Sequence, residues 1–279
     1  MKAFAGNKLV VNADDYGMTR SISKGILKAH ANGIVTSVSI VTNTPSFKEA
    51  ISWVNDIEID KGIHLTLNSG KPLSPPLEHL PILNNRSEFY LYPIRTPFFY
   101  FICKRPWKTW VHAEFRRQIE KLLTVNIKIS HLDSHFHIHV FPGITDVISE
   151  IVKEYDIPYV RKPCERLLKK KIMYPAQNLI SFLSRKNIPS VGRKSLPFYG
   201  LTEAGHVNSS TLIRILKSIG TKTGELMLHP GYNSEENVDY YPARTNHFEE
   251  ELKAAVHPDV HGLLRERNIT LARRSQLDD

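Results

Sequence analysis

The segment HLDSHFHIH, from His131 to His139, carries an unusual density of side chains that can bind a metal or transfer a proton. Its odd-numbered residues are four histidines and Asp133, and most residues between them are apolar. An extended strand would therefore present the ionisable groups on one face. Because neutral imidazole and carboxylate suit a divalent ion, the pattern predicts a metal site; a solvated histidine-rich turn is the alternative.

Not every histidine in this segment can bind the same ion. A metal-bound imidazole usually has its second ring nitrogen held by another polar group. We expect Asp133 and His137 to serve in that supporting role or to contact the substrate.

Two adjacent carboxylates, Asp14 and Asp15, follow a short β-branched run at residues 8–13. Neighbouring residues of a continued strand point to opposite faces, so both acids can face one pocket only if the backbone turns there, as Gly17 permits. One carboxylate could then bind a metal while the other accepts a proton. Capping of the following helix is the competing interpretation.

Two isolated histidines stand in or after apolar runs. His64 lies in GIHLTL, with its side chain opposite its apolar neighbours, and His229 ends GELMLH just before a Pro-Gly break. A histidine titrates near neutral pH, so His229 could act as a general acid. Either histidine could instead serve only in packing.

The strands and helices around these residues must bring them together. Apolar β-branched runs alternate with helical periodicity, which favours a parallel sheet. About seven or eight such units predict an α/β fold of the TIM-like (β/α) barrel type, closed or distorted, with its active site at the carboxyl ends of the strands. An open doubly wound sheet is the alternative, although no glycine-rich phosphate fingerprint follows the first strand. We expect strands at 8–13, 33–42, 62–67, 128–133, 157–161, 224–229 and 268–272, and helices at 21–31, 45–54 and 143–155.

We expect residues 1–279 to form a single barrel domain, with residues 70–110 as an insertion after the third strand. The insertion is rich in proline and then in aromatic residues, which makes it poor helix material, and a second irregular stretch at 164–196 is basic. Aromatic rings beside Lys and Arg are typical of segments at a membrane interface; packing against the barrel is the alternative. The residues concerned are Phe98–Phe101, Lys104, Arg105, Trp107, Lys108, Trp110, Lys169–Lys171, Arg185 and Lys186.

The composition excludes several classes of protein. Hydrophobic residues make up 41% and charged residues 23% of the 279, which is typical of a folded globular domain and not of a disordered tail or a coiled coil. Two cysteines are too few for a disulfide framework, and no stretch is apolar enough to span a membrane. We therefore expect a cytoplasmic protein, in peripheral contact with the inner face of the membrane if the aromatic and basic surfaces dock there.

Four ordered motifs, VNADDYG, GIHLTL, HLDSHFHIH and LMLHPGY, resemble those of the YdjC/ChbG family of carbohydrate deacetylases over nearly the whole chain. The proline-rich insertion and the C-terminal EELKAAVHPDVHGLLRERNITL look most like the branch associated with hopanoid biosynthesis, HpnK. The resemblance implies a TIM-like barrel and metal-dependent hydrolysis of an N-acetyl group from an amino sugar. If the aromatic and basic stretches dock on a membrane, we expect the sugar to be lipid-linked, as in a hopanoid glycoside.

The resemblance also implies roles for particular residues. A divalent metal ion, magnesium or zinc, would be bound by Asp15, His64 and His135. Asp14 would be the general base and His229 the general acid. Arg161, which ends the run IPYVR, would orient the base or bind a sugar hydroxyl. Many relatives have histidine where this chain has Phe136, and since an extended segment puts Phe136 on the apolar face, we expect the metal site to stay intact.

Other functions stay open at this point. A deacetylase of soluble chitooligosaccharides would use the same residues. A metal-dependent phosphoester hydrolase also places Asp and His at a barrel rim, and the net charge of +9 favours an anionic substrate, but two-metal sites usually need more bridging carboxylates. Only the charge suggests a nucleic-acid-binding module, so we expect no nucleic acid partner. Homo-oligomerisation also stays open.

Overall fold

The β-branched run near the amino terminus forms β1 (Asn7–Tyr16), the longest of the described strands, which is buried from Leu9 onward. The structure, a computed structural model, describes residues 7–75, 88–89, 104–165, 175–191, 194–220, 223–241 and 247–277. The other strands described are β2 (Ser37–Ile40), β3 (Asp60–Leu65), β4 (Leu132–Ser134), β5 (Phe198–Tyr199), β6 (Gly224–Leu228) and β7 (Ile269–Leu271). Their order is β4-β3-β2-β1-β6-β5, β7 pairs with the start of β1, and these pairings are parallel.

Short bridges continue the ring of strands between β4 and β5. Leu132 of β4 pairs with Val160, and Tyr159 pairs with Lys194, from which the chain runs on into β5. The Leu132 N–H donates to the Tyr159 carbonyl at 2.9 Å, and the Arg161 N–H donates to the Leu132 carbonyl at 3.0 Å. The predicted TIM-like barrel is therefore confirmed in a distorted form, in which the strand expected at 157–161 is reduced to bridging residues.

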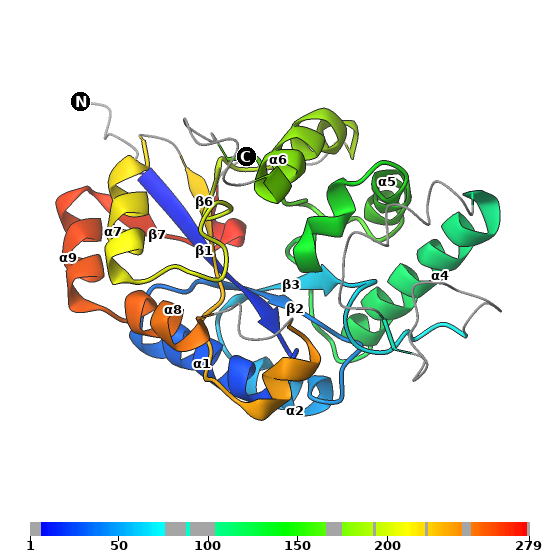
Figure 1. The fold of residues 1–279 in the computed structure, drawn as a ribbon, viewed down its shortest axis with the longest axis horizontal. Coiled ribbons are helices and arrows are strands. Elements are labelled where there is room, and N and C mark those ends of the chain that lie inside the picture. Colours follow the sequence, from blue (N-terminus) through cyan, green and yellow to red (C-terminus); the bar gives the residue numbers. More distant parts are fainter. Residues whose placement is uncertain are drawn as a thin grey trace.

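Helices surround these strands (Figure 1). The first, α1 (Arg20–Asn32), begins where the Thr19 hydroxyl accepts the Ile22 N–H, and Ile22, Ile26 and Ala29 form its buried face. This is the helix predicted at 21–31, and burial of its apolar stripe is what fixes it against the sheet. The other helices described are α2 (Phe47–Val54), α4 (Lys104–Leu123), α5 (Ile144–Glu154), α6 (Pro175–Asn187), α7 (Ser209–Ser218), α8 (Phe248–Ala255) and α9 (Pro258–Glu266).

The last part of the predicted insertion is helical and packed, not irregular. Helix α4 starts inside residues 70–110. Pro106 does not prevent this, because it lies in the first turn, where a proline costs no intrahelical hydrogen bond. Trp107 and Trp110 are only 2% and 5% exposed, stack with ring centroids 5.9 Å apart, and Trp110 Nε1 donates to the Pro75 carbonyl at 2.8 Å. The interfacial role expected for these two tryptophans is therefore wrong.

Much of the remaining insertion, including Phe98–Phe101, lies outside the described residues, as do the side chains of Lys104 and Arg105. The basic stretch at 164–196 was also expected to be irregular, but it contains helix α6, while Lys169–Lys171 lie outside the described residues. Among the described helices, none is both long and apolar enough to cross a membrane.

Candidate active site

The carboxyl end of β1 turns so that both of its acids are buried in the barrel. Asp15 has a φ of 68°, and the register of β1 against β2 is interrupted between Ala13 and Tyr16. Asp14 and Asp15 are 2% and 1% exposed. The turn expected at Gly17 thus begins at Asp15 itself, which lets two consecutive carboxylates lie inside the barrel.

The histidine-rich segment is a strand only as far as Ser134. Beyond it the chain forms a 3-10 turn, η1 (His135–Val140), in which Phe136 and His137 have left-handed φ angles of 52° and 54°. The Ser134 hydroxyl accepts the His139 N–H at 3.0 Å, a local bond that replaces strand pairing. The expected extended strand over 131–139 is therefore wrong in its second half, and its histidines do not share one face.

Two of these histidines are held inside the barrel by structural contacts. The His131 ring packs where a Cβ on Gly62 would clash, with Nε2 3.0 Å from the Ser39 hydroxyl. His139 Nδ1 lies 2.6 Å from the Ser134 hydroxyl. Burial lowers the pKa of both rings, to about 4 for His139, so both are neutral.

His135, in contrast, reaches the carboxylate of Asp15. Its Nδ1 lies 2.8 Å from Asp15 Oδ1, and His64 Nε2 lies 3.1 Å from the same oxygen. The three side chains offer ligand atoms that all lie within 4.8 Å of one another, and all three are buried. Phe136 does not sit on a separate apolar face, because its ring contacts the His135 ring at a centroid distance of 4.4 Å.

The chemistry of this cluster fits a divalent ion. His64 Nδ1 is 2.7 Å from Asp133 Oδ1, which is the carboxylate support that metal-binding histidines usually have. The Tyr241 hydroxyl donates to Asp15 Oδ2 at 2.6 Å, and the buried Nε2 of His135 has no hydrogen-bond partner among the described residues. Two imidazoles and one carboxylate, supported by Asp133 and Tyr241, are a ligand set that would leave open positions for water and substrate.

A second possible ligand set fits less well. Asp14, His64 and Asp133 also lie close enough to hold an ion. However, Arg161 already contacts both of these carboxylates, so a cation there would compete with a buried guanidinium. Asp15, His64 and His135 are therefore the better candidate ligand set.

The charges around the cluster favour a cation. Burial alone lowers the pKa of His64, but the carboxylates of Asp133 and Asp15 outweigh it and raise this pKa to about 10. Burial raises the pKa of Asp15, whereas His135 and His64 lower it more, so the pKa lies well below its usual range. Asp15 is therefore an ionised carboxylate, as a metal ligand would need to be.

Asp14 is held by a fully buried arginine. Arg161 Nη1 donates to Asp14 Oδ2 at 2.6 Å and Nη2 donates to Oδ1 at 2.7 Å. Burial raises the pKa of Asp14, but the adjacent guanidinium more than offsets this and holds the pKa well below its usual range. Asp14 is thus an ionised, oriented carboxylate with Arg161 as its counter-ion, and it lies beside His64 of the candidate ligand set.

His229 follows β6, on the rim of the same end of the barrel. Its backbone N–H donates to the fully buried Glu251 at 2.5 Å, and its Nδ1 is 3.9 Å from the same carboxylate. His229 is among the groups that lower the pKa of Asp14, so its ring lies within electrostatic reach of that carboxylate. His229 therefore lies on the same side of the barrel as Asp14, because β6 pairs directly with β1 up to Ala13 and Leu228.

His137 lies two residues after His135, in the same turn η1. Its ring is buried, its Nδ1 has no hydrogen-bond partner among the described residues, and burial together with Arg161 lowers its pKa well below the usual value. Asp133 contacts His64, whereas the Nδ1 of His137 is, among the described residues, free to meet another molecule, so His137 is a candidate for contact with substrate.

Several residues of the site were not expected from the sequence. Glu225 had a detectable signal, because an acid in the middle of the apolar strand GELML must find a buried partner. Tyr241 and Glu251 had none, since each acts through a fold contact with a residue far away in the chain.

Comparisons with known proteins find matches over nearly the whole chain. A family model described as YdjC-like protein matches residues 8–266. A carbohydrate deacetylase of Thermoanaerobacter pseudethanolicus is 30% identical over 275 residues, covering 96% of this chain and 98% of the relative. One from Clostridium beijerinckii is 28% identical over 269 residues, covering 95% and 97%.

Among solved structures, one Enterococcus faecalis protein has a closely similar fold. Its name ascribes to it the cleavage of cellobiose phosphate, it superposes with a TM-score of 0.74 over 99% of this chain and 100% of its own, and it is 22% identical. At that identity the likeness bears on the fold alone, and it supports the distorted α/β barrel.

Proposed function

We propose that this chain, which belongs to the YdjC-like family, is a carbohydrate deacetylase that uses a divalent metal to hydrolyse the N-acetyl group of an amino sugar. The observation that carries the proposal is the Asp15–His64–His135 cluster beside the Asp14–Arg161 pair. A metal position next to an ionised carboxylate is the arrangement that metal-assisted amide hydrolysis uses. Full-length relatives named carbohydrate deacetylases support the same reaction.

In the proposed reaction each residue has a defined task. A divalent ion held by Asp15, His64 and His135 would polarise the acetamide carbonyl and lower the pKa of water. Asp14 takes the proton of the attacking water, and Arg161 keeps the Asp14 carboxylate ionised and oriented. His229 donates a proton to the departing nitrogen, so the products are acetate and a free amino sugar.

The proposed substrate position lies beside Tyr241. This residue donates to Asp15 and also lines a cavity of about 640 Å³. The cavity is bordered by polar side chains, among them Asn237 and His247, which suit the hydroxyl groups of a sugar ring.

The direct test is acetate release after metal removal. We expect the chelated protein to release no acetate from N-acetylglucosamine or diacetylchitobiose, and magnesium or zinc to restore the reaction. His64→Ala should stay inactive with added metal, while the control His261→Ala, a change far from the cluster in sequence, should respond like the wild type. Acetate release that is unaffected by chelation would contradict the proposal. So would a protein that releases phosphate from an aryl phosphate but no acetate from the amino sugars.

We further propose that the amino sugar is attached to a lipid, as in a hopanoid glycoside. Helix α6 exposes Leu179 and Phe182, which are 49% and 62% accessible, followed by the exposed Arg185 and Lys186. The helix also packs against η1, the turn that begins with His135, so α6 neighbours the candidate active site. Exposed apolar side chains beside cations are typical of segments that dock on anionic membranes.

Co-sedimentation with vesicles of phosphatidylcholine and phosphatidylglycerol tests the lipid proposal. The wild type should bind at low salt, and the Leu179→Ser, Phe182→Ser double variant should bind more weakly. Leu123→Ser, which changes an exposed leucine on α4, is the matched control and should bind like the wild type. No vesicle binding, with full activity on short soluble chitooligosaccharides, would assign the protein to soluble sugars instead.

A further inference from the structure

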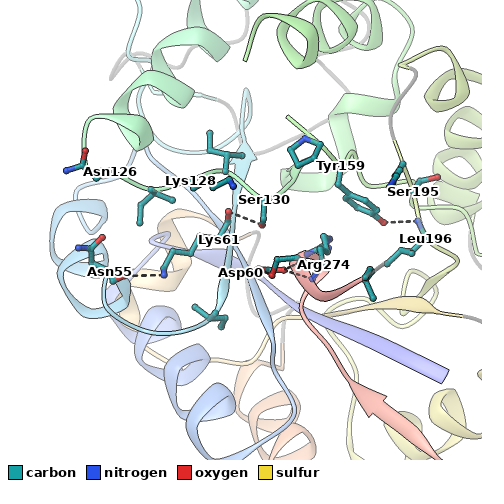
Figure 2. A pocket seen from close by; sticks show the side chains of 17 residues that line it. Asn55, Asp60, Lys61, Asn126, Lys128, Ser130, Tyr159, Ser195, Leu196 and Arg274 are labelled. Atoms are coloured by element: carbon teal, nitrogen blue, oxygen red, sulfur yellow. Dashed lines mark hydrogen bonds between the residues drawn. The ribbon is translucent and has the colours of Figure 1, made fainter. Parts of the chain in front are cut away.

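A cavity of about 990 Å³ lies at the amino-terminal ends of the strands, opposite the metal cluster. Its lining includes Asp60, the first residue of β3, and residues just before β4 and β5. Tyr159 and Arg274 also line it (Figure 2). The Arg274 side chain is only 4% exposed and its guanidinium lies over the Tyr159 ring, 4.8 Å from the centroid. Arg274 therefore extends from this cavity into the barrel interior.

One route of buried contacts runs from Arg274 to Asp14 through Glu225. Arg274 Nη2 is 2.7 Å from Glu225 Oε1, and the same oxygen accepts Arg161 Nε at 2.8 Å. The second oxygen, Oε2, accepts the Tyr159 hydroxyl at 2.8 Å. Glu225 thus joins two arginines, one of which holds the carboxylate of Asp14 in a two-point contact.

A second route reaches the same carboxylate through Asn12. Arg274 Nη1 donates to the Ser37 hydroxyl at 2.5 Å and to Asn12 Oδ1 at 3.3 Å. The Asn12 amide in turn donates to Asp14 Oδ1 at 2.7 Å. Arg274 therefore supports both of the side chains that hold Asp14.

The geometry of a guanidinium explains why these contacts matter. Its five N–H donors lie in one plane, so the direction of the fork that binds Asp14 depends on what holds Nε on the other edge. In Arg161 that partner is Glu225. Without Arg274, the buried Glu225 carboxylate loses one of its two cations, and the Arg161 plane and the Asn12 amide both lose support.

We propose that Arg274 and Glu225 are positioning residues for the reaction, which hold Arg161 and Asn12 and thereby orient Asp14 from the opposite end of the barrel. The inference rests on the proposed deacetylase function, and it adds a residue that lies beyond the span 8–266 covered by the family model. Arg274 touches neither substrate nor metal.

The test compares Arg274→Met with Arg273→Met. Arg273 is the adjacent arginine, but it pairs with Glu58 at the surface and takes no part in the buried network. For each variant we measure metal content, thermal unfolding, and kcat and KM for acetate release from diacetylchitobiose. We also record the ¹⁵N NMR signal of the Arg161 Nε–H, which is assigned by its disappearance in the variant Arg161→Lys. For Arg274→Met we expect kcat to fall about tenfold to a hundredfold, the usual effect of a small misplacement of a reacting group.

KM and metal content should stay within about twofold of the wild-type values, because uniform binding and the metal ligands are untouched. The Arg161 Nε–H signal should shift and exchange faster with solvent, and Arg273→Met should match the wild type in every measurement. If Arg274→Met does not fold, the double variant Glu225→Gln, Arg274→Met removes one buried charge of each sign and should fold with the same loss of kcat.

A folded variant with wild-type kcat and an unchanged Arg161 signal overturns the proposal, and so does a loss of stability with no loss of kcat in the folded protein. Absence of acetate release by the wild type would instead overturn the deacetylase function. In that case an unchanged Arg161 signal still refutes the positioning contact, and an altered one supports it.

Discussion

Acidification from pH 7 to pH 5 should destabilise this protein through His139. The ring is fully buried, its Nδ1 accepts the Ser134 hydroxyl at 2.6 Å and its Nε2 donates to the Arg161 carbonyl at 3.1 Å. The contact with Ser134 needs the neutral imidazole, because a protonated Nδ1 cannot accept a hydrogen bond, whereas the contact with the Arg161 carbonyl is made by either form of the ring. Burial accordingly lowers the pKa of His139 from 6.5 to about 4.

The sign and size of the effect follow from proton linkage. Between the two pKa values the unfolded chain binds a proton at His139 and the native protein does not, so stability falls as the pH falls. One pKa unit corresponds to about 1.4 kcal/mol, so the full effect below pH 4 is about 3 kcal/mol. About 2 kcal/mol of this is lost by pH 5.

Urea unfolding of the metal-free protein at pH 7 and pH 5 measures this loss. The variant His139→Gln cannot titrate and keeps an amide donor for the Arg161 carbonyl. We expect the free energy of unfolding of the wild type to drop by about 2 kcal/mol more than that of His139→Gln. The control His261→Gln changes a half-buried histidine and should keep the wild-type pH dependence. Equal pH dependence in the wild type and His139→Gln would refute the reasoning.

Three further predictions concern the site. His64→Ala and His135→Ala should each lose bound metal and activity while circular dichroism shows an intact fold; full metal occupancy in both would disprove the ligand assignment. Asp14→Asn should keep its metal but lose about two or more orders of magnitude in kcat, the usual scale for a general base, and unchanged turnover would contradict this role. His229→Ala should also keep its metal while activity falls, measured as acetate release; if metal is lost instead, His229 is a further ligand.

The barrel and its main residues could be predicted because they depend on local patterns. The β-branched run at 8–13 and the apolar stripe of α1 are read from neighbouring residues, since side-chain period follows directly from strand and helix geometry. Asp14, Asp15 and His229 end strands, and parallel strands of a barrel bring such ends to one rim. Their gathering at one site was therefore accessible to sequence reasoning.

Local pattern failed where a side chain redirected the backbone. The alternation of ionisable and apolar residues over 131–139 predicted one histidine-rich face. In the structure the Ser134 hydroxyl accepts the His139 N–H, and the backbone turns at Phe136, which has a left-handed φ. The proline content of residues 70–110 likewise predicted an irregular segment and not the start of helix α4. Pro106 is compatible with the helix because it lies in the first turn, where a helix accepts proline.

Tertiary structure alone decided which ionisable groups meet. His135 and Asp15 are 120 residues apart in the chain, and Tyr241 lies 226 residues from the Asp15 carboxylate to which it donates. No periodicity links such positions. A buried charge can serve as a ligand, a counter-ion or a positioning group, and its role depends on which partner the barrel places within hydrogen-bond distance. The physical reason is that only a nearby partner offsets the free-energy cost of taking the charge out of water.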